Sequence, residues 1–292
     1  MLAKGVDNHG RILIISVYPK KGKVIVDSQR REISIVKNGR TESESMALIG
    51  EEPLSIRIQG APYAVIMRTP GAEKAHVAGF CLGEGIVDAP EDLTNIAFCD
   101  GEDTNVVTVT LTAERRTRIA EHLDRRTYIS QTSCGICGKS IVADLVQALS
   151  PAADTDPLDG TGALDCLLRL GDHQPLRDKT RAAHGAAIYD HGLNRLSVAE
   201  DVGRHNALDK AIGRLFLDGQ LRQARLLTLS SRISYELVQK SARARIPVIL
   251  AISRPTALAV RLAEALNMTL ASLGKGDSLM VYCNSHRLNW PG

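Results

Sequence analysis

The chain has 292 residues, a formal net charge of +3 and 44% hydrophobic residues. These values are ordinary for a globular protein of one large or two modest domains. Aromatic residues make up only 3% of the sequence, so stacking surfaces for single-stranded nucleic acid are scarce. The small positive charge is compatible with an anionic ligand but does not favour DNA, and we expect no nucleic-acid partner.

The apolar run at residues 12–17 is far too short for a signal-peptide core or a membrane span. We therefore expect a cytoplasmic protein with no membrane partner. Its six cysteines should then be reduced and free to react.

The first part of the chain is predicted to be rich in strands. Residues 11–67 contain runs in which apolar and polar residues alternate. Thr69, followed by a proline, predicts the N-cap of a helix that runs toward Leu82. A strand at 106–111 and a charged helix at 113–126 follow.

Cys134 and Cys137 lie in the run Ser133-Cys134-Gly135-Ile136-Cys137-Gly138-Lys139, just before a helix predicted from apolar spacing at 141–149. The first N–H groups of such a helix are unpaired and its dipole end is positive. A thiolate there is stabilised, so the pKa of a cysteine should fall below the ~8.5 of a free thiol. The cysteine pair is therefore the candidate reactive site.

Other interpretations of the pair remain open at this point. A structural zinc site needs four ligands, and the other cysteines are scattered singly, so we expect no metal. A thioredoxin-like redox pair fits the spacing, although no aromatic residue precedes Cys134. Two buried structural cysteines are less favoured, because glycines flank the pair and the approach to it is polar.

Residues 150–162 are rich in Asp, Pro and Gly and predict a flexible connector. Beyond them, strands and helices alternate. Strands are predicted at 186–189, 196–198, 226–229, 246–252, 268–273 and 279–282, and helices at 206–217, 235–244 and 256–266. This pattern predicts a parallel or mixed sheet covered by helices on both faces.

Ligands of such sheets bind beyond the carboxyl ends of the strands. Three loops would share that rim: Ser230-Ser231-Arg232, Ser253-Arg254-Pro255 and the loop from Leu273 to Asp277. Backbone N–H groups, two arginines and a lysine there suit an anion such as a phosphate. Any one of these loops, taken alone, is more simply interpreted as an ordinary exposed turn; the three together on one edge favour a ligand site.

A second dense motif places Asp201, Arg204, His205 and Asn206 around a strand-to-helix turn. One interpretation is a buried Arg–Asp network that locks the turn. The other has Arg204 and His205 facing the thiol site.

Residues 133–139 and the run Glu200-Asp201-Val202-Gly203-Arg204-His205-Asn206-Ala207-Leu208-Asp209-Lys210 resemble the two hallmark motifs of the formate dehydrogenase accessory sulfurtransferases, the FdhD/NarQ family. Shorter resemblances extend the similarity over roughly residues 45–285; they lie at 51–54, 69–71, 84–86, 234–240 and 257–260.

The resemblance implies an α/β fold in two parts. Residues 126–292 would form a cytidine-deaminase-like domain, with a mixed sheet flanked by helices and without the deaminase zinc site. Residues 1–125 would form a smaller N-terminal α+β domain. The resemblance also implies a homodimer.

The implied function is a sulfur relay. A cysteine desulfurase would load a persulfide, and the protein would pass the sulfur to the molybdenum cofactor, a bis-molybdopterin guanine dinucleotide, of the formate dehydrogenase catalytic subunit. Cys134 matches the persulfide-bearing cysteine, and Cys137 would hold the acceptor geometry or resolve the persulfide by forming a disulfide. The cofactor-binding loop of the family matches Leu273, Gly274, Lys275, Gly276, Asp277 and Ser278.

The chain departs from the family pattern at three places. Thr180-Arg181-Ala182 stands where Thr-Gly-Gly is usual, Ser231 replaces the glycine of Ser-Gly-Arg, and Gly83 replaces a threonine. The alternatives to a sulfur relay are a cofactor chaperone that moves no sulfur and a thiol–disulfide oxidoreductase.

Overall fold

The computed structural model describes residues 2–6, 12–16, 26–99, 104–120 and 149–290. Cys134, Cys137 and most of the helix predicted at 141–149 lie outside the described residues. The predicted domain boundary between residues 125 and 126 lies outside them as well.

Six strands form the central sheet, in the order β11-β10-β12-β13-β14-β15. β12, β13 and β14 run parallel, and β10, β11 and β15 add antiparallel neighbours. The predicted mixed α/β fold is therefore confirmed. The bounds are β10 (His184–Tyr189), β11 (Arg195–Asp201), β12 (Leu226–Leu229), β13 (Val248–Ala251), β14 (Thr269–Leu273) and β15 (Leu279–Cys283).

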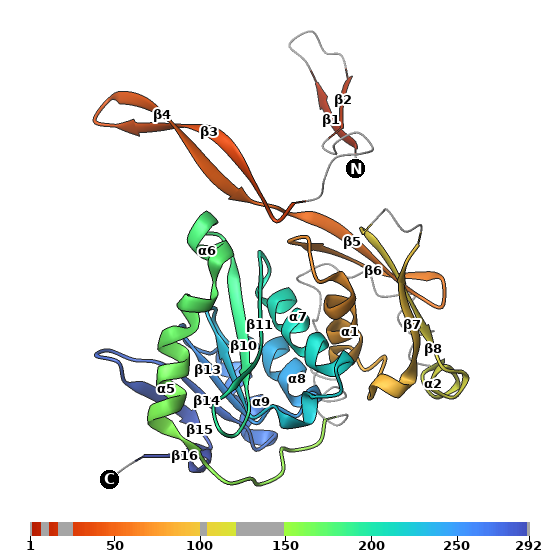
Figure 1. The fold of residues 1–292 in the computed structure, drawn as a ribbon, viewed down its shortest axis with the longest axis vertical. Coiled ribbons are helices and arrows are strands. Elements are labelled where there is room, and N and C mark those ends of the chain that lie inside the picture. Colours follow the sequence, from red (N-terminus) through yellow and green to blue (C-terminus); the bar gives the residue numbers. More distant parts are fainter. Residues whose placement is uncertain (1, 7–11, 17–25, 100–103, 121–148, 291–292) are drawn as a thin grey trace.

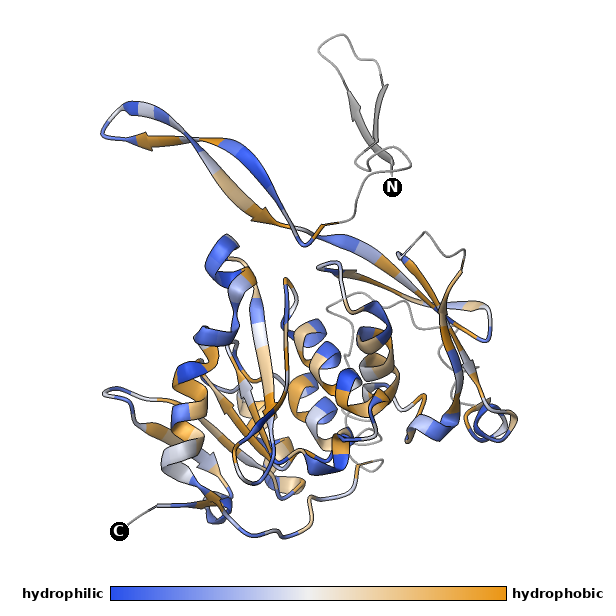
Figure 2. Cartoon of the chain, in the orientation of Figure 1, coloured by the Kyte–Doolittle hydropathy of each residue, from blue (hydrophilic) through white to orange (hydrophobic). Residues whose placement is uncertain are grey.

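Helices cover both faces of this sheet (Figure 1). One face packs against α7 (Arg204–Leu217), α8 (Tyr235–Arg243) and α9 (Ala257–Ala265), and the other against α5 (Gly160–Leu168). Successive side chains of a strand point to opposite faces, so Leu226 packs on the α5 side and Leu227 on the α7 side. Burial on both sides explains why β13 is apolar throughout and why β12 and β14 are mostly apolar (Figure 2).

A second sheet of four strands has the order β6-β5-β8-β7. Its inner face packs against α1 (Glu73–Gly83), in the same hydrophobic cluster that contains α7. Its strands are β5 (Glu52–Ile58), β6 (Ala61–Arg68), β7 (Leu93–Phe98) and β8 (Val106–Leu111), and α2 (Ala113–Arg118) follows β8. β3 (Ser28–Lys37) and β4 (Arg40–Ile49) form an exposed hairpin that projects from the body, and β1 (Leu2–Val6) pairs with β2 (Ile12–Ser16) (Figure 1).

The remaining elements are short. They are β9 (Leu158–Asp159), α6 (Pro175–Thr180), β16 (Leu288–Asn289) and the 3₁₀ turns Pro90–Asp92, Arg169–His173, Leu221–Gln223 and Ser285–Arg287. Among the helices described, none is both long enough and apolar enough to cross a membrane.

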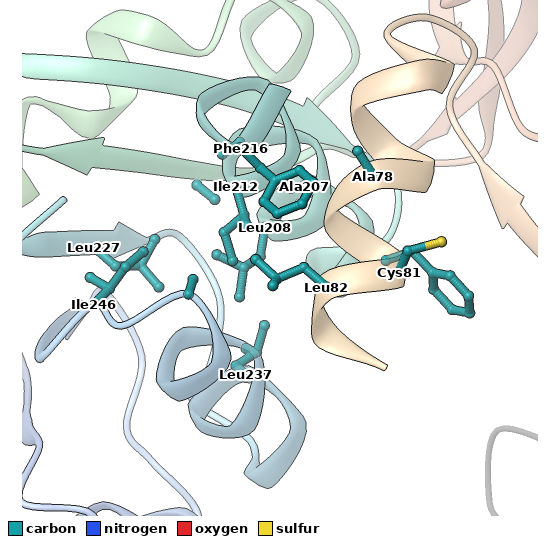
Figure 3. Packing of buried hydrophobic residues seen from close by; sticks show 14 of the residues in the cluster. Ala78, Cys81, Leu82, Ala207, Leu208, Ile212, Phe216, Leu227, Leu237 and Ile246 are labelled. Carbon is teal, nitrogen blue, oxygen red and sulfur yellow. The ribbon is translucent and has the colours of Figure 1, made fainter. Parts of the chain in front are cut away.

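α1 and α7 cross with their backbones in direct contact. A methyl group at Gly79 would lie 1.9 Å from the carbonyl oxygen of Asp209, and one at Gly213 would lie 1.8 Å from that of Ala75. Both positions therefore require glycine. Around this crossing Figure 3 shows side chains of α1, α7 and α8 packed together, among them Ala78, Leu82, Ala207, Leu208, Ile212, Phe216 and Leu237.

The connection after α1 is clamped by two arginines from opposite sides. Arg115 of α2 pairs with Asp88 and donates to the carbonyl oxygens of Ile86 at 2.7 Å and Gly85 at 2.8 Å. Arg243 of α8 donates to the other oxygen of Asp88 at 2.5 Å. Partial burial alone would raise the pKa of Asp88, but the hydrogen bonds from Arg243 and Arg115 outweigh it and lower that pKa.

The predicted start of α1 was wrong. The helix begins at Glu73, after Ala72 in the left-handed region at φ 56°, and no side chain caps it. Thr69 does not serve as the N-cap, because its hydroxyl oxygen instead accepts a hydrogen bond from the backbone N–H of Val202 at 3.0 Å.

The connector predicted at 150–162 was wrong for its second part: residues 150–157 have no regular structure, but β9 and the start of α5 occupy residues 158–162. Asp159 is the N-cap of α5, and its carboxylate accepts from the N–H groups of Thr161 and Gly162. The Asp-Gly-Thr-Gly run therefore begins a helix where composition alone indicates a turn. The preceding strand β9 pairs in parallel with β16 near the C-terminal end of the chain.

Candidate functional site

The carboxyl ends of the three parallel strands meet at one edge of the central sheet. Leu229 of β12 lies beside Ala251 of β13, which lies beside Ser272 of β14. The antiparallel neighbours put the start of β10 and the end of β11 at the same edge, with His184 opposite Asp201. The prediction that the three candidate loops share one rim is confirmed.

An open pocket of about 670 Å³ lies at this edge between the loop after β13 and the β14–β15 loop. Four of its lining residues belong to the predicted cofactor loop, whereas Gly276, Asp277 and Arg232 do not line it. Arg254 and Lys275 supply two exposed cations, and neither forms an ion pair with any residue in the described ranges. The lining residues are Ile252, Ser253, Arg254, Leu273, Gly274, Lys275, Ser278 and Met280.

The β14–β15 loop is a compact turn. The N–H of Gly274 donates to the carbonyl oxygen of Ser278 at 2.7 Å, and the Ser278 hydroxyl donates to that of Lys275 at 2.8 Å. A methyl group at Gly274 would lie 2.5 Å from the Ser278 hydroxyl oxygen, so a larger residue there would displace that hydroxyl group. The loop thereby presents Lys275 at the pocket with little backbone freedom.

The motif at 200–210 builds a buried polar network around Asp201, which is fully buried. One carboxylate oxygen of Asp201 accepts from Lys210 Nζ at 2.7 Å and from the N–H of Thr69 at 3.1 Å. The other accepts from the N–H of Gly203 at 2.8 Å and from Asn206 Nδ2 at 2.9 Å. The predicted network that locks the turn exists, but its cation is Lys210, and the prediction of an Arg–Asp pair was wrong.

His205 joins α7 to α8. Its Nε2 lies 3.2 Å from the Ser234 hydroxyl oxygen and 3.5 Å from a carboxylate oxygen of Glu236. The hydrogen bond from His205 lowers the pKa of Glu236 to about 2. Because the cysteine pair lies outside the described residues, the prediction that Arg204 and His205 face it stays a prediction.

A second buried ion pair, missed by the sequence analysis, holds α7 to α8. Lys240 Nζ donates to the two carboxylate oxygens of Asp209 at 2.8 and 2.9 Å, and it lies 5.5 Å from the centre of the Phe80 ring. Burial raises the pKa of Asp209 to about 6. Burial alone would lower the pKa of Lys240, but the Asp209 carboxylate outweighs it and raises that pKa, so the pair is ionised at neutral pH.

Three of the four cysteines in the described part of the chain do not resemble activated thiols. Burial raises the pKa of the Cys81 and Cys283 thiols, and it raises the pKa of Cys166 to about 11. Thiols with a raised pKa are poor nucleophiles at neutral pH. Cys99 is exposed, with its sulfur 3.1 Å from the Thr108 hydroxyl oxygen. Within the ranges described, no three His, Cys, Asp or Glu side chains are grouped to hold a metal ion.

The fold of this chain is similar to that of a protein whose structure has been solved. A crystal structure of a formate dehydrogenase accessory protein from Desulfotalea psychrophila superposes with a TM-score of 0.72 at 21% identity. The match covers 90% of this chain and 99% of that protein. At this low identity the similarity concerns the fold.

Sequence comparison gives much closer relatives. A protein of Streptomyces coelicolor named sulfur carrier protein FdhD is 39% identical over 270 residues, which cover 89% of this chain and 95% of that protein. The protein of the same name from Mycobacterium tuberculosis is 38% identical over 262 residues, 85% of this chain and 93% of that protein. The sequence pattern of the FdhD/NarQ family matches residues 49–289, which include both sheets and the whole loop-bearing edge, and the chain therefore belongs to the FdhD/NarQ family.

Proposed function

We propose that the protein is a sulfur carrier that serves a formate dehydrogenase. The observation that carries this proposal is the extended similarity to proteins named sulfur carrier protein FdhD, combined with the Cys134 and Cys137 pair in this sequence. In the proposed reaction the Cys134 thiolate attacks the terminal sulfur of a cysteine desulfurase persulfide. The donor cysteine leaves as a thiolate, and Cys134 becomes the persulfide.

The proposed acceptor is the molybdenum cofactor of the formate dehydrogenase catalytic subunit, a bis-molybdopterin guanine dinucleotide. The pocket beside the β14–β15 loop supports this, because Arg254 and Lys275 offer two cations with no ion-pair partner among the described residues and Ser253 offers a hydroxyl group. Such donors suit the phosphates of a nucleotide. The cytidine-deaminase-like architecture, the division at residues 125 and 126, the homodimer and the cytoplasmic location belong to the same proposal.

Sulfur loading of single cysteine variants tests the proposal. A persulfide carrier needs only the cysteine that bears the sulfur, whereas a disulfide oxidoreductase needs both, because each turnover closes the pair. After incubation with a cysteine desulfurase and cysteine, we expect wild-type protein and Cys137→Ser to gain about 32 Da per sulfur atom. Cys134→Ser should gain none.

The alternatives predict other outcomes. Loss of loading in both variants would favour a paired-thiol mechanism. Full loading of Cys134→Ser would assign the carrier role to another cysteine. If Cys134→Ala still produced an active formate dehydrogenase, the protein would be a cofactor chaperone, and the carrier proposal would be wrong. Cys99→Ser is the matched control, because Cys99 is an exposed thiol at the edge of the other sheet.

A further inference from the structure

His76 is a fully buried histidine beside the crossing of α1 and α7, and the proposed function does not use it. It lies in the first turn of α1, next to Ala75, whose carbonyl oxygen closely approaches Gly213 of α7. Neither ring nitrogen of His76 forms a hydrogen bond of normal geometry with any residue in the described ranges. Because a polar group is costly to bury without a partner, its surroundings decide which charge state it can hold.

The charged side chains around His76 are already paired with one another. Three ion pairs, with cations from β6, α7 and α8, have nitrogen–oxygen distances of 3.1, 2.7 and 2.8 Å, and all six side chains are buried. The pairs are Arg68–Glu73, Lys210–Asp201 and Lys240–Asp209. Glu84, which is partly exposed just after α1, adds an acid near Lys240. The charges of the three buried pairs therefore balance only while His76 is neutral.

The cluster favours the neutral imidazole. Burial, then the charges of Lys210, Lys240 and Arg68, lowers the pKa of His76 well below its ordinary value, and the side chain of Asn206 opposes them only in part. A proton added to the ring would place a charge in the interior without a counterion, because the three buried carboxylates are already bound to cations. An unpaired buried charge is strongly destabilising.

The same cluster joins two parts of the structure. α1 and the inner face of the four-stranded sheet share one hydrophobic cluster with α7. Lys210 Nζ donates to the carbonyl oxygen of Thr69 at 2.7 Å, and Asn206 Nδ2 donates to that of Met67 at 2.8 Å, so α7 is bonded to the end of β6. A charge placed on His76 therefore acts on the contact between α1 and α7.

We infer that His76 is an acid-sensitive switch in this contact: protonation of its imidazole releases α1, together with the four-stranded sheet, from α7. The switch goes beyond the proposed function, because it needs neither the cysteine pair nor the pocket beside the β14–β15 loop. The released imidazole takes up a proton with the ordinary pKa of about 6.5, whereas the packed one does not. The closed form is therefore fully stable above about pH 6.5, and the open form gains population as the pH falls below that value.

The size of the effect follows from the proton taken up on opening. For one histidine with these properties, the equilibrium constant for opening should rise about 25-fold between pH 7 and pH 5. Asp209 acts in the opposite direction, because its pKa is raised to about 6 and the closed form takes up a proton below that pH. Comparison of the wild type with a His76 variant at the same pH removes this second contribution, since both proteins keep Asp209.

Labelling of Cys81 with 4,4′-dithiodipyridine measures the opening on the full-length protein. Cys81 is fully buried and lies on α1, as His76 does, and peptide mass spectrometry identifies the labelled cysteine. We expect the Cys81 labelling rate of the wild type, divided by that of His76→Gln, to rise about 25-fold from pH 7 to pH 5. An unchanged quotient would overturn the inference.

His191→Gln is the matched control, because His191 is exposed in the turn between β10 and β11. The labelling rate of the wild type, divided by that of this variant, should be the same at both pH values. A rise as large as that for His76→Gln would mean that the acid response does not come from His76, and it would also overturn the inference.

A measurement on the wild type alone covers the case in which His76→Gln does not fold. Cys283 is buried on β15 and reports unfolding of the central sheet. From pH 7 to pH 5, local release of α1 should raise the labelling rate of Cys81 relative to that of Cys283 by about threefold or more, after the opposing contribution of Asp209. Equal changes at the two cysteines would mean that the whole protein unfolds together, and the switch would be refuted.

Discussion

Replacing Lys240 with Met should strongly destabilise the protein. Lys240 and Asp209 are both almost fully buried, and Lys240 Nζ contacts both carboxylate oxygens of Asp209. The variant keeps the volume of the side chain but leaves a carboxylate buried with no cation. Breaking a buried pair on one side costs about 3–5 kcal/mol, and we expect that loss in the free energy of unfolding.

A double-mutant cycle isolates the pair from the other effects of each substitution. We expect Asp209→Asn combined with Lys240→Met to lose about 2 kcal/mol less than the sum of the single variants, because no buried charge remains unpaired. Lys179→Met is the matched control: Lys179 is half-exposed and lies 3.9 Å from Asp27. An exposed pair of this kind contributes about 0–1 kcal/mol.

The pH dependence gives a further check on Lys240→Met. Burial already raises the pKa of Asp209 to about 6 beside Lys240, and without that cation it should be higher still. The folded variant then binds a proton that its unfolded state releases, so the loss relative to wild type is largest at neutral pH and above. It shrinks as the pH falls toward about 6, below which Asp209 is protonated in both folded proteins. Urea unfolding followed by circular dichroism at pH 5 and pH 7.5 measures this. Additive single variants, or a loss below 1 kcal/mol, would refute the reasoning.

Two further predictions concern the clamp after α1 and the end of α6. Asp88→Asn should lower the free energy of unfolding by about 1–2 kcal/mol at pH 7. We expect a value near ~1 kcal/mol, because Asp88 is half-exposed. The lowered pKa of Asp88 means that its contribution is complete above ~3.9 and is lost at lower pH, so the urea midpoints of the two proteins should converge on acidification. Arg181→Gly should raise the free energy of unfolding by up to about 1 kcal/mol, because Arg181 has φ 58°, a conformation that favours glycine. The thermal unfolding midpoint of the variant should therefore be higher than that of wild type, and an unchanged midpoint would contradict the prediction.

The strands and helices of the last third were predictable because each follows a simple period. Residues 226–229 were assigned to a strand without error, and the helices after Gly203, Ser234 and Thr256 begin within two residues of their predicted starts. What could not be predicted depends on contacts distant in sequence. Ala72 takes a left-handed conformation in place of a Thr69 cap because Thr69 is bound to Asp201 and Val202, more than 130 positions away.

In the candidate site, too, some features could be predicted from the sequence and others depend on contacts between distant residues. Strand order alone was enough to predict that Lys275 and Arg254 share an edge, since parallel strands end on the same side. The partner of Asp201 was not predictable from spacing. Arg204 and Lys210 both follow Asp201 on the same helix, and only the position of β6 and Thr69 decides between them. The pairing of Asp209 with Lys240 likewise needs the packing of α7 on α8.

The glycine crossing of α1 and α7 has a consequence for synthesis of the chain. Gly213 leaves the ribosome more than 130 positions after Gly79, and at ordinary elongation rates this takes roughly 7 to 27 s. During that interval the apolar face of α1 and the inner face of the four-stranded sheet have no partner from α7. The nascent N-terminal half should therefore be a client of ribosome-associated chaperones until residue 217 has emerged.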